Sequence, residues 1–418
     1  MPSAKRLSTD ADAPAGPGRA VLGFGGTVDH EIEWDAALVA RLAEEYRIRL
    51  TDCDPDAPIV DERSLLAVIL GHARLRRGGE RFVESPAALE QFAARHRKSV
   101  TIGGTCVRAG LVMRALGVRS TALLVAVDDT FLERFPPDCD YLVSDDAAVL
   151  IPHLIVQLPE AGSIPVADGE IVIDRPNRLI FVNDPAQSSM ELSPDLGDTL
   201  AGAEVFLISG FNAMTDAALA RRRIHGLRAA MRALPAEALV IYEDAGYHSA
   251  EVSAVARRGI VTLADVFSMN EDELQEHLGH EIDLLDPTAI CDALGAMHRM
   301  FPGPTLVVHT RHWALASGAR APLLEGALAG GIRAATARYM HGDAATAADI
   351  AAVDGLSVPP EHRIVADALT ATDPNVLRCI PAYAVPTSKP TTIGLGDSFV
   401  GGLAAGLVSA RRAEGALS

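Results

Sequence analysis

Cysteines are few in this sequence, and a long apolar stretch is missing altogether. The cysteines are scattered, odd in number and never spaced as C-x-x-C, which indicates neither a disulfide framework nor a zinc site. No uncharged apolar run reaches about 18 residues, and residues 1–20 lack the apolar segment of a signal peptide. We therefore expect no membrane span and a location in the reducing cytoplasm. The five cysteines are Cys53, Cys106, Cys139, Cys291 and Cys379.

Basic residues are outnumbered, with 37 Lys and Arg against 55 Asp and Glu and a formal net charge of -18. This balance argues against nucleic acid or an anionic membrane as a partner, but it permits a small phosphorylated ligand in a local basic pocket. With 49% hydrophobic residues, the 418-residue chain can build a substantial core. Residues 1–19 are expected to form a disordered tail, followed by a folded region over residues 20–418.

Short apolar runs alternate with longer helical patterns along the folded region. This alternation is typical of βαβ units and predicts an α/β fold with a mostly parallel central sheet. The expected buried strands are 20–24, 120–127, 205–209, 238–242, 261–267 and 305–309. The expected helices include 216–234, 248–258, 271–280, 287–299 and 346–356.

Polar or glycine residues follow four of these expected strands. In open α/β sheets the ligand lies outside the carboxyl ends of the strands, so we expect these residues to line one crevice. They are Gly210 and Asn212, Glu243 and Asp244, Ser268 and Asn270, and His309 and Thr310.

Residues 141–192 differ in character from the rest of the chain. Proline and glycine punctuate the segment, short stretches alternate between polar and apolar residues, and no long helical pattern occurs. The segment therefore predicts a small antiparallel sheet set apart from the main layer, which would serve as a lid.

A glycine turn, Gly394-Leu395-Gly396-Asp397, leads directly into a helical run of small residues. Glycines let the backbone approach a ligand closely, and the first amides of a helix lack intrahelical partners, so this junction can bind a phosphoryl group. Asp397 would repel a resting phosphate, but it could accept the proton of a hydroxyl group that attacks the phosphate. The alternative is that Asp397 only caps the helix and the glycines only form a turn.

A second polar pair, Asn270 and Glu273, follows an expected strand and opens an expected helix. Residues three apart lie on one face of a helix, so the Asn270 amide oxygen and the Glu273 carboxylate could hold the waters of an Mg²⁺ ion. The alternative is a plain capping box. Glu243 is the best candidate for a further carboxylate near the metal, unless it only solvates the end of its strand.

These two motifs resemble the NxxE and GxGD motifs of the ribokinase-like superfamily, in the same chain order. Longer stretches resemble specifically its ADP-dependent glucokinase and phosphofructokinase branch, and together they cover about residues 20 to 410. The stretches are Arg77-Gly78-Gly79-Glu80, Ile102-Gly103-Gly104, Asn177-Arg178-Leu179-Ile180, Leu207-Ile208-Ser209-Gly210-Phe211, Met269-Asn270-Glu271-Asp272-Glu273-Leu274, Val308-His309-Thr310 and Ile393-Gly394-Leu395-Gly396-Asp397.

The resemblance implies a ribokinase-like fold, in which a Rossmann-like sheet has helices on both faces and a smaller α/β lid covers the sugar. The lid is expected at about residues 25–60 and 141–192. The resemblance also implies transfer of the β-phosphoryl group of ADP to a hydroxyl of a sugar or sugar phosphate, with release of AMP. We expect Mg²⁺ as the cofactor and a monomer or small homo-oligomer.

Site residues follow from the motifs and the resemblance together. The expected catalytic residues are Asp397 as the general base, Gly394, Gly396 and Arg178. The expected nucleotide contacts are Gly394, Leu395, Gly396, His309, Thr310 and Asn270. The resemblance places at or near the sugar Gly23, Asp29, Glu80, Gly103 and Gly104. The expected metal-side residues are Glu273, Asn270, Glu243 and Asp397.

Some of these assignments have a structural alternative. Arg178 would reach the transferring phosphoryl group on lid closure, or it is an ordinary exposed arginine. His309 and Thr310 would touch the nucleotide, or the histidine is a satisfied structural residue. Lys389 is either a phosphate contact or a solvated loop charge.

The sequence departs from the family's usual pattern near the acceptor. An asparagine-containing turn usually precedes the sugar-binding aspartate, whereas this chain has Gly25-Gly26-Thr27-Val28-Asp29. Gln-Ala-Gly usually follows the paired glycines, whereas this chain has Thr105-Cys106-Val107. Because an unmatched polar group discriminates strongly between acceptors, these exchanges favour an acceptor other than glucose or fructose 6-phosphate.

Two other functions are open at this point. An ATP-dependent ribokinase-like kinase of a sugar or nucleoside would share both short motifs. A non-catalytic paralogue would bind sugar or nucleotide and act as a regulator. The presence of Asp397, Asn270 and Glu273 argues against the paralogue, because a protein without catalysis has no need of a base together with a metal box.

Overall fold

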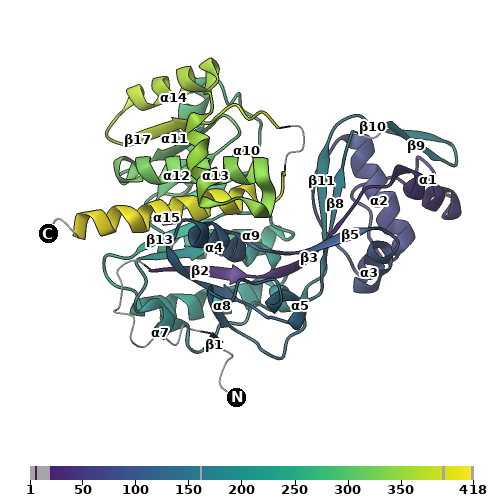
Figure 1. Cartoon of the computed structure of the whole chain (residues 1–418), viewed down its shortest axis with the longest axis horizontal. Coiled ribbons are helices and arrows are strands. Elements are labelled where there is room, and N and C mark those ends of the chain that lie inside the picture. Colours follow the sequence, from purple (N-terminus) through teal and green to yellow (C-terminus); the bar gives the residue numbers. More distant parts are fainter. Residues whose placement is uncertain (1–4, 7–18, 161, 388–390, 416–418) are drawn as a thin grey trace.

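The computed structural model describes residues 5–6, 19–160, 162–387 and 391–415. These residues form a large lobe around a ten-stranded sheet and a small lobe around a five-stranded sheet, side by side (Figure 1). We define the small lobe as residues 27–103 and 153–182, and the large lobe as the other described residues.

The large sheet is mostly parallel. The strands run in the order β1-β7-β6-β2-β12-β13-β14-β15-β16-β17, and every pairing from β7 to β15 is parallel, whereas β1 and β16 are antiparallel to their neighbours. Strand β12 is an uninterrupted apolar run that is fully buried, as expected of a strand covered on both faces. The strands are β1 (Lys5–Arg6), β2 (Arg19–Gly25), β6 (Arg119–Leu124), β7 (Asp140–Val143), β12 (Val205–Ile208), β13 (Leu239–Glu243), β14 (Val266–Asn270), β15 (Thr305–His309), β16 (Trp313–Ser317) and β17 (Leu377–Pro381).

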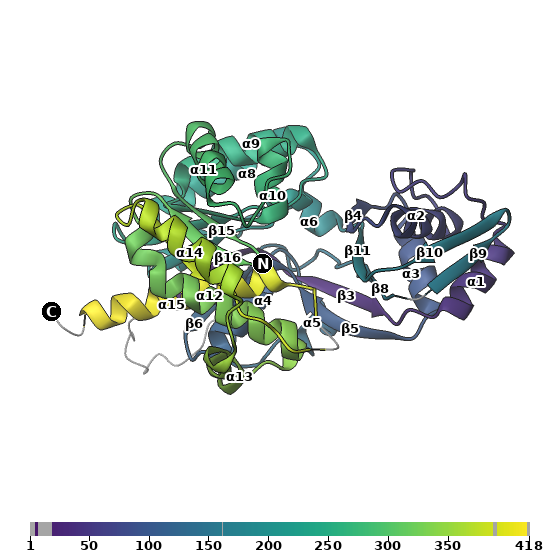
Figure 2. The same ribbon diagram turned by 90° about the horizontal axis from the view of Figure 1, so that it is seen from above.

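Helices cover both faces of this sheet, as Figure 2 shows from above. One face carries α8 (Ala217–Ala230), α9 (Ala250–Ile260), α10 (Glu271–Leu278) and α11 (Pro287–Met300). The other carries α4 (Thr105–Ala115), α12 (Ala321–His341) and α15 (Leu395–Gly415). Helix α13 (Ala347–Ala352) contacts α12, and α14 (Pro360–Thr372) contacts β17. Short helices in the connections are α5 (Asp129–Leu132), α6 (Pro185–Ser189) and α7 (Leu196–Leu200).

Helix α15 is packed tightly between α4 and α12. A Cβ atom added to Gly401 would lie 2.7 Å from the Cα of Ala109 in α4, and one added to Gly402 would lie 2.4 Å from the carbonyl oxygen of Gly330 in α12. The small-residue run after Asp397 therefore lets three helices approach closely. This packing fixes the position at which α15 begins.

The small lobe has its own sheet, helices and hydrophobic core. Its sheet has the order β4-β11-β8-β3-β5, and a separate hairpin pairs β9 with β10. Its core includes Leu42, Leu65, Phe92 and Phe181, none of which belongs to the core of the large lobe. The strands are β3 (Thr27–Ile32), β4 (Gly79–Phe82), β5 (Lys98–Gly103), β8 (His153–Leu158), β9 (Gly162–Val166), β10 (Gly169–Ile173) and β11 (Asn177–Val182). The helices are α1 (Ala36–Glu45), α2 (Glu62–Leu75) and α3 (Pro86–Ala94).

The predicted α/β architecture is confirmed, with two differences in the bounds of the small lobe. The small sheet takes strands from a longer first segment than residues 25–60, because β4 and β5 return to it after α2 and α3. Its second segment is shorter than 141–192, because β7 pairs in the large sheet. Within that segment the pairings are antiparallel as predicted, β8 with β11 and β9 with β10, but the small sheet as a whole is mixed, since β11 is parallel to β4 and β8 is parallel to β3.

The predicted strand at 261–267 begins later than expected. Val261–Leu263 forms a 3₁₀ turn at the end of α9, so β14 starts at Val266. In the predicted tail, Lys5–Arg6 pairs with β7 and Arg19 opens β2, while residues 1–4 and 7–18 lie outside the described residues. None of the described helices has the length and apolar composition that crossing a membrane requires.

Candidate active site

A cavity of about 940 Å³ is lined by residues of both lobes. The residues that follow four neighbouring parallel strands meet there, as the strand pattern predicts: Asn212 after β12, Asp244 after β13, Asn270 at the end of β14 and Thr310 after β15. Ser268 does not line the cavity, because it lies within β14 and is fully buried.

The glycine turn before α15 forms part of the cavity wall. Gly394 has a φ of 68°, which glycine adopts without the strain of a side chain. Arg338 donates from Nε to the carbonyl oxygen of Ile393 at 2.6 Å, and Arg178 donates from Nη1 to that of Thr392 at 2.7 Å. Two guanidinium groups, one from each lobe, therefore hold the chain just before the turn.

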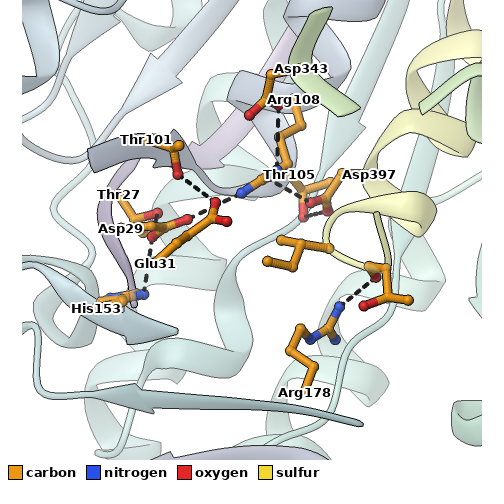
Figure 3. A network of polar contacts seen from close by, with 12 residues as sticks. Thr27, Asp29, Glu31, Thr101, Thr105, Arg108, His153, Arg178, Asp343 and Asp397 are labelled. Atoms are coloured by element: carbon orange, nitrogen blue, oxygen red, sulfur yellow. Dashed lines mark hydrogen bonds and ion pairs between the residues drawn. The ribbon is translucent and has the colours of Figure 1, made fainter. Parts of the chain in front are cut away.

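Asp397 is the third residue of α15 and its carboxylate is oriented by helix α4 (Figure 3). The Thr105 hydroxyl donates a hydrogen bond to Oδ1 of Asp397 at 2.7 Å. Oδ2 lies 3.7 Å from Nε of Arg108. The Asp397 side chain is 24% exposed and lines the cavity, so it can reach a bound ligand.

Arg108 joins the carboxylate of Asp397 to the small lobe. Its side chain is 2% exposed, and its Nη2 donates to Oδ2 of Asp29 at 3.1 Å. Nη1 lies 3.8 Å from Oδ1 of Asp343, which also pairs with Arg338. Burial alone would lower the pKa of Arg108, but the carboxylates of Asp29, Asp397 and Asp343 outweigh it and raise that pKa.

Asp29 lies on β3 at the small-lobe side of the cavity. Its Oδ1 accepts a hydrogen bond from the Thr27 hydroxyl at 2.8 Å, and His153 Nδ1 lies 3.9 Å away. A Cβ atom added to Gly103 would lie 2.3 Å from Oδ2 of Asp29. Gly103 therefore makes room for the aspartate and does not line the cavity itself.

Of the other two glycines that the resemblance places at or near the sugar, one lines the cavity and one does not. Gly104 lines the cavity with a φ of 92°, and an added Cβ would lie 2.9 Å from the backbone nitrogen of Gly26. Gly23 does not line the cavity, because it sits within β2, where an added Cβ would lie 2.8 Å from Cδ1 of Leu123. We conclude that Gly23 serves the packing of β2 against β6.

Glu80 lines the cavity from β4 and contacts the opposite lobe. Its Oε1 lies 2.8 Å from Nε2 of His248, in the loop after β13. Burial tends to raise the pKa of Glu80, but the hydrogen bond and charge of His248 outweigh it and lower that pKa. Glu80 and Arg178 thus both cross from the small lobe to the large one.

His309 and Thr310 line the cavity beside the glycine turn and also have structural contacts. His309 Nε2 lies 3.1 Å from Oε1 of Glu243, and the imidazole stacks on Phe399 of α15 with ring centroids 4.5 Å apart. The Thr310 hydroxyl accepts from the amide of Trp313 and donates to its carbonyl oxygen, which shapes the turn between β15 and β16.

Comparison with known proteins gives the family. The conserved region of the ADP-specific Phosphofructokinase/Glucokinase family matches residues 18–298. The chain belongs to this family. Its members are ADP-dependent sugar kinases, so the chain is a phosphotransferase. A search of curated proteins found no match.

Solved structures of this family share the fold. A phosphofructokinase from Pyrococcus horikoshii OT3 with AMP has a TM-score of 0.74 at 14% identity, over 95% of this chain and 99% of that one. The last common ancestor of ADP-dependent phosphofructokinases from Methanosarcinales has a TM-score of 0.70 at 14% identity, over 94% of both chains. An ADP-dependent kinase in complex with fructose-6-phosphate and ADPβS has a TM-score of 0.69 at 14% identity, again over 94% of both chains.

The Asn270 and Glu273 motif of this family member forms a capping box. Asn270 Oδ1 accepts from the amides of Asp272 and Glu273, and a Glu273 carboxylate oxygen accepts from the amide of Asn270 at 2.8 Å. Burial, and then the carboxylates of Glu243 and Asp244, raise the pKa of Glu273 well above its usual value. Both motif residues still line the cavity.

These carboxylates fit a hydrated cation better than a directly ligated one. Oε2 of Glu243 is buried and makes no hydrogen bond to the described residues. Within the described part of the chain, no group of three or more His, Cys, Asp or Glu side chains is arranged to hold a metal. An Mg²⁺ ion keeps several waters and needs few protein ligands, so Glu243 and Glu273 suit contacts through water.

The sequence analysis missed several residues that line or support this family member's cavity. Thr105 appeared only as a departure from the usual pattern, and Arg108 was passed over. The two residues follow the paired glycines and are three positions apart, a spacing that places them on one helix face. No local signal indicated His248, which is brought to Glu80 by the packing of the two lobes. Lys389 lies outside the described residues.

Proposed function

We propose that this chain transfers the β-phosphoryl group of ADP to a hydroxyl group of a sugar or sugar phosphate and releases AMP. Family membership supports both the donor and the acceptor class. A similar structure holds fructose-6-phosphate with ADPβS, and another holds AMP. In the reaction the acceptor oxygen bonds to the β-phosphorus while the bond from that phosphorus to the bridging oxygen breaks, and AMP carries the bridging oxygen away.

The position of Asp397 carries this proposal. Its carboxylate lies at the start of α15, beside the glycine turn, in a cavity that Asp29 and Glu80 line from the small lobe. An acceptor held on the small-lobe side would direct a hydroxyl toward Asp397, which takes the proton as the oxygen attacks. The hydrogen bond from Thr105 occupies Oδ1 and leaves Oδ2 for the substrate hydroxyl.

Charge on the transferring phosphoryl group would be stabilised from two sides. The amides of Leu395, Gly396 and Asp397 are the first of α15, where a helix offers unpaired donors and the positive end of its dipole. Arg178 lies on β11 with its guanidinium at the carbonyl of Thr392, next to the turn. We assign Arg178 to the same phosphoryl oxygens in the transition state.

Glu243 and Glu273 would hold Mg²⁺ through water, with Asn270 completing the surface beside them. The buried, unpaired Oε2 of Glu243 and the cluster of carboxyl groups support this assignment. When bound, the ion neutralises negative charge on the phosphates. His309 contacts Oε1 of Glu243 and packs against Gly396. These two contacts hold the carboxylate and the glycine turn in fixed relative positions.

The donor is tested by incubating the purified chain with Mg²⁺ and either ADP or ATP at equal concentration. The acceptors are a panel of hexoses, pentoses, sugar phosphates and nucleosides. We expect AMP and a phosphorylated acceptor from ADP, with little turnover from ATP. ADP accumulating from ATP without any AMP would establish the ATP-dependent alternative, and binding without turnover for every acceptor would favour the non-catalytic paralogue.

The base is tested by Asp397→Asn, which keeps the shape of the side chain and removes the proton acceptor. Turnover should fall by about 10²- to 10⁴-fold while ADP binding by calorimetry changes little. A turnover within about threefold of the unmodified enzyme would rule Asp397 out as the base. Asp367→Asn, on α14 and outside the cavity lining, is the matched control and should leave turnover unchanged.

A further inference from the structure

Helix α4 directs two side chains at the proposed base, and neither belongs to the motifs that identify the family. Thr105 is the first residue of α4 and Arg108 lies three residues later, so both project from one face of the helix. Thr105 contacts Oδ1 of Asp397 and Arg108 faces Oδ2 (Figure 3). Both oxygens of one carboxylate therefore lie against the same helix.

We propose that Arg108 is a positioning residue that holds the acceptor-side carboxylate of Asp29 and the base Asp397 in fixed relative positions, with Thr105 fixing the rotation of the base. The inference rests on the proposed role of Asp397. Arg108 is among the residues that line the cavity, but only 2% of its side chain is exposed, and its nitrogens lie within 3.8 Å of carboxylate oxygens of Asp29, Asp343 and Asp397, so it acts through these carboxylates.

The backbone of the glycine turn is shaped to admit Arg108. A Cβ atom added to Gly394 would lie 2.5 Å from Cδ, 3.0 Å from Nε and 3.1 Å from Nη1 of Arg108. The guanidinium stem therefore passes directly over the Cα of Gly394. Gly394, in the turn before α15, therefore also provides the space for Arg108, which reaches the carboxylate of Asp397.

The charges explain why a cation is needed at this point. Asp29, Asp343 and Asp397 surround the buried guanidinium of Arg108, and the Asp29 carboxylate is buried with it, whereas the side chains of Asp397 and Asp343 are 24% and 43% exposed. Repulsion that involves the buried Asp29 carboxylate is therefore weakly screened by water. Arg338 adds a second cation, but it pairs with Asp343 and the carbonyl of Ile393. Arg108 is thus the group that lies between the acceptor-side carboxylate and the base, and its removal leaves them facing each other.

A positioning role and a purely structural role predict different kinetics. Misplacing a reacting group lowers kcat while substrate binding survives, whereas a general loss of structure lowers stability and binding together. In Arg108→Gln we expect kcat to fall by about 10²-fold, with the KM for ADP within about threefold of the unmodified enzyme. In Arg108→Lys, which restores the charge, kcat should recover at least about tenfold over Arg108→Gln.

The matched control is Arg114→Gln on the same helix. Arg114 carries the same charge, is paired with Asp138 at 2.8 Å and lies outside the cavity lining, so kcat should stay unchanged. Equal loss of kcat and of ADP affinity in Arg108→Gln, with no recovery in Arg108→Lys, would overturn the positioning role.

Thr105 tests the proposal without disturbing any charge. Thr105→Val removes the hydroxyl donor to Asp397 and keeps the volume, whereas Thr105→Ser keeps the donor. We expect Thr105→Val to lower kcat by about tenfold and Thr105→Ser to retain most of it, because the lost hydrogen bond orients an ionised carboxylate, and hydrogen bonds to charged groups are stronger than neutral ones. Equal kcat values for the two variants would contradict the role of Thr105.

A stability measurement separates failure of this inference from failure of the proposed function. Melting temperatures of Arg108→Gln, Asp397→Asn and the double variant test whether the two groups interact, whatever the reaction. We expect the double variant to lose less than the sum of the single losses, because each single change leaves an unpaired partner. Additive losses would overturn the inference even in an active enzyme, and coupling without ADP-dependent turnover would leave the contact standing while refuting the function.

Discussion

At the residue scale, the site depends on a few charged side chains and on the glycines that make room for them. Gly103 accommodates the carboxylate of Asp29, and Gly394 accommodates the stem of Arg108. Both glycines belong to stretches that resemble those of the family, yet their contacts here are with charged side chains. A glycine in a binding motif can thus serve a neighbouring side chain as much as the ligand.

Gly394→Ala tests the closeness of that contact. The new Cβ would meet Arg108 at 2.5 Å, and alanine at a φ of 68° adds backbone strain of about 1–2 kcal/mol. We expect a lower melting temperature and a loss of turnover similar to that of Arg108→Gln, because the arginine is displaced. Gly202→Ala, at a glycine with open space around it, is the matched control for kinetics and unfolding. A fully active Gly394→Ala enzyme would show that the turn tolerates a side chain.

The sequence predicted where single residues lie better than which residues they contact. Asp397, Asn270 and Glu243 all line the predicted crevice. Their positions could be predicted because the end of a strand or the start of a helix is visible in the local sequence pattern. Arg108 was passed over, because its partners Asp29, Asp343 and Asp397 are brought to it only by the tertiary fold. The capping contacts of Asn270 were foreseen as an alternative, since a capping box is local.

At the element scale, the N-terminus of α15 is fixed by two helices, α4 and α12, and by two arginines of different lobes. Glycines of α15 pack on α4 and α12, while Arg338 and Arg178 bind the carbonyls just before the turn. The long helix α12 was harder to predict than α8 or α11, because its alanine- and glycine-rich sequence carries little contrast between faces. Helix α15 was expected from the glycine turn that precedes it. The packing of both helices depends on close backbone approach rather than on an apolar stripe.

Arg178→Ala tests how β11 serves the site. Arg178 reaches from the small lobe to the carbonyl of Thr392, so its phosphoryl contact would form fully only with the lobes together. We expect kcat to fall by about 10²-fold and ADP affinity to weaken much less. Arg175→Ala, on the turn before β11 and outside the cavity lining, is the matched control and should leave both unchanged. Equal losses of rate and affinity would mean that Arg178 binds ADP before closure, and no loss in either would make it a surface residue.

At the scale of the whole molecule, two lobes with separate cores share one cavity. The sequence predicted a lid from the change in pattern at residues 141–192, but it could not give the first segment its full length. The sequences of α2 and α3, within 27–103, do not differ from those of amphipathic helices in the large lobe. Only the tertiary pairing of β4 with β11 and of β5 with β3 assigns these strands to the small sheet. The two lobes meet through side chains, including Glu80 with His248 and Arg178 with the Thr392 carbonyl.

This arrangement predicts that the small lobe moves toward the large lobe when acceptor binds. A kinase must keep water away from the transferring phosphoryl group, and a lobe with its own core can move as a unit about its connections. Small-angle X-ray scattering should show a smaller radius of gyration with acceptor and a non-transferable ADP analogue than with the analogue alone. A sugar that the enzyme does not phosphorylate serves as the matched control and should leave the radius of gyration unchanged. An identical radius with the true acceptor would indicate that the cavity is already closed around its substrates, and Arg178 would then hold the phosphoryl group without any motion of its lobe.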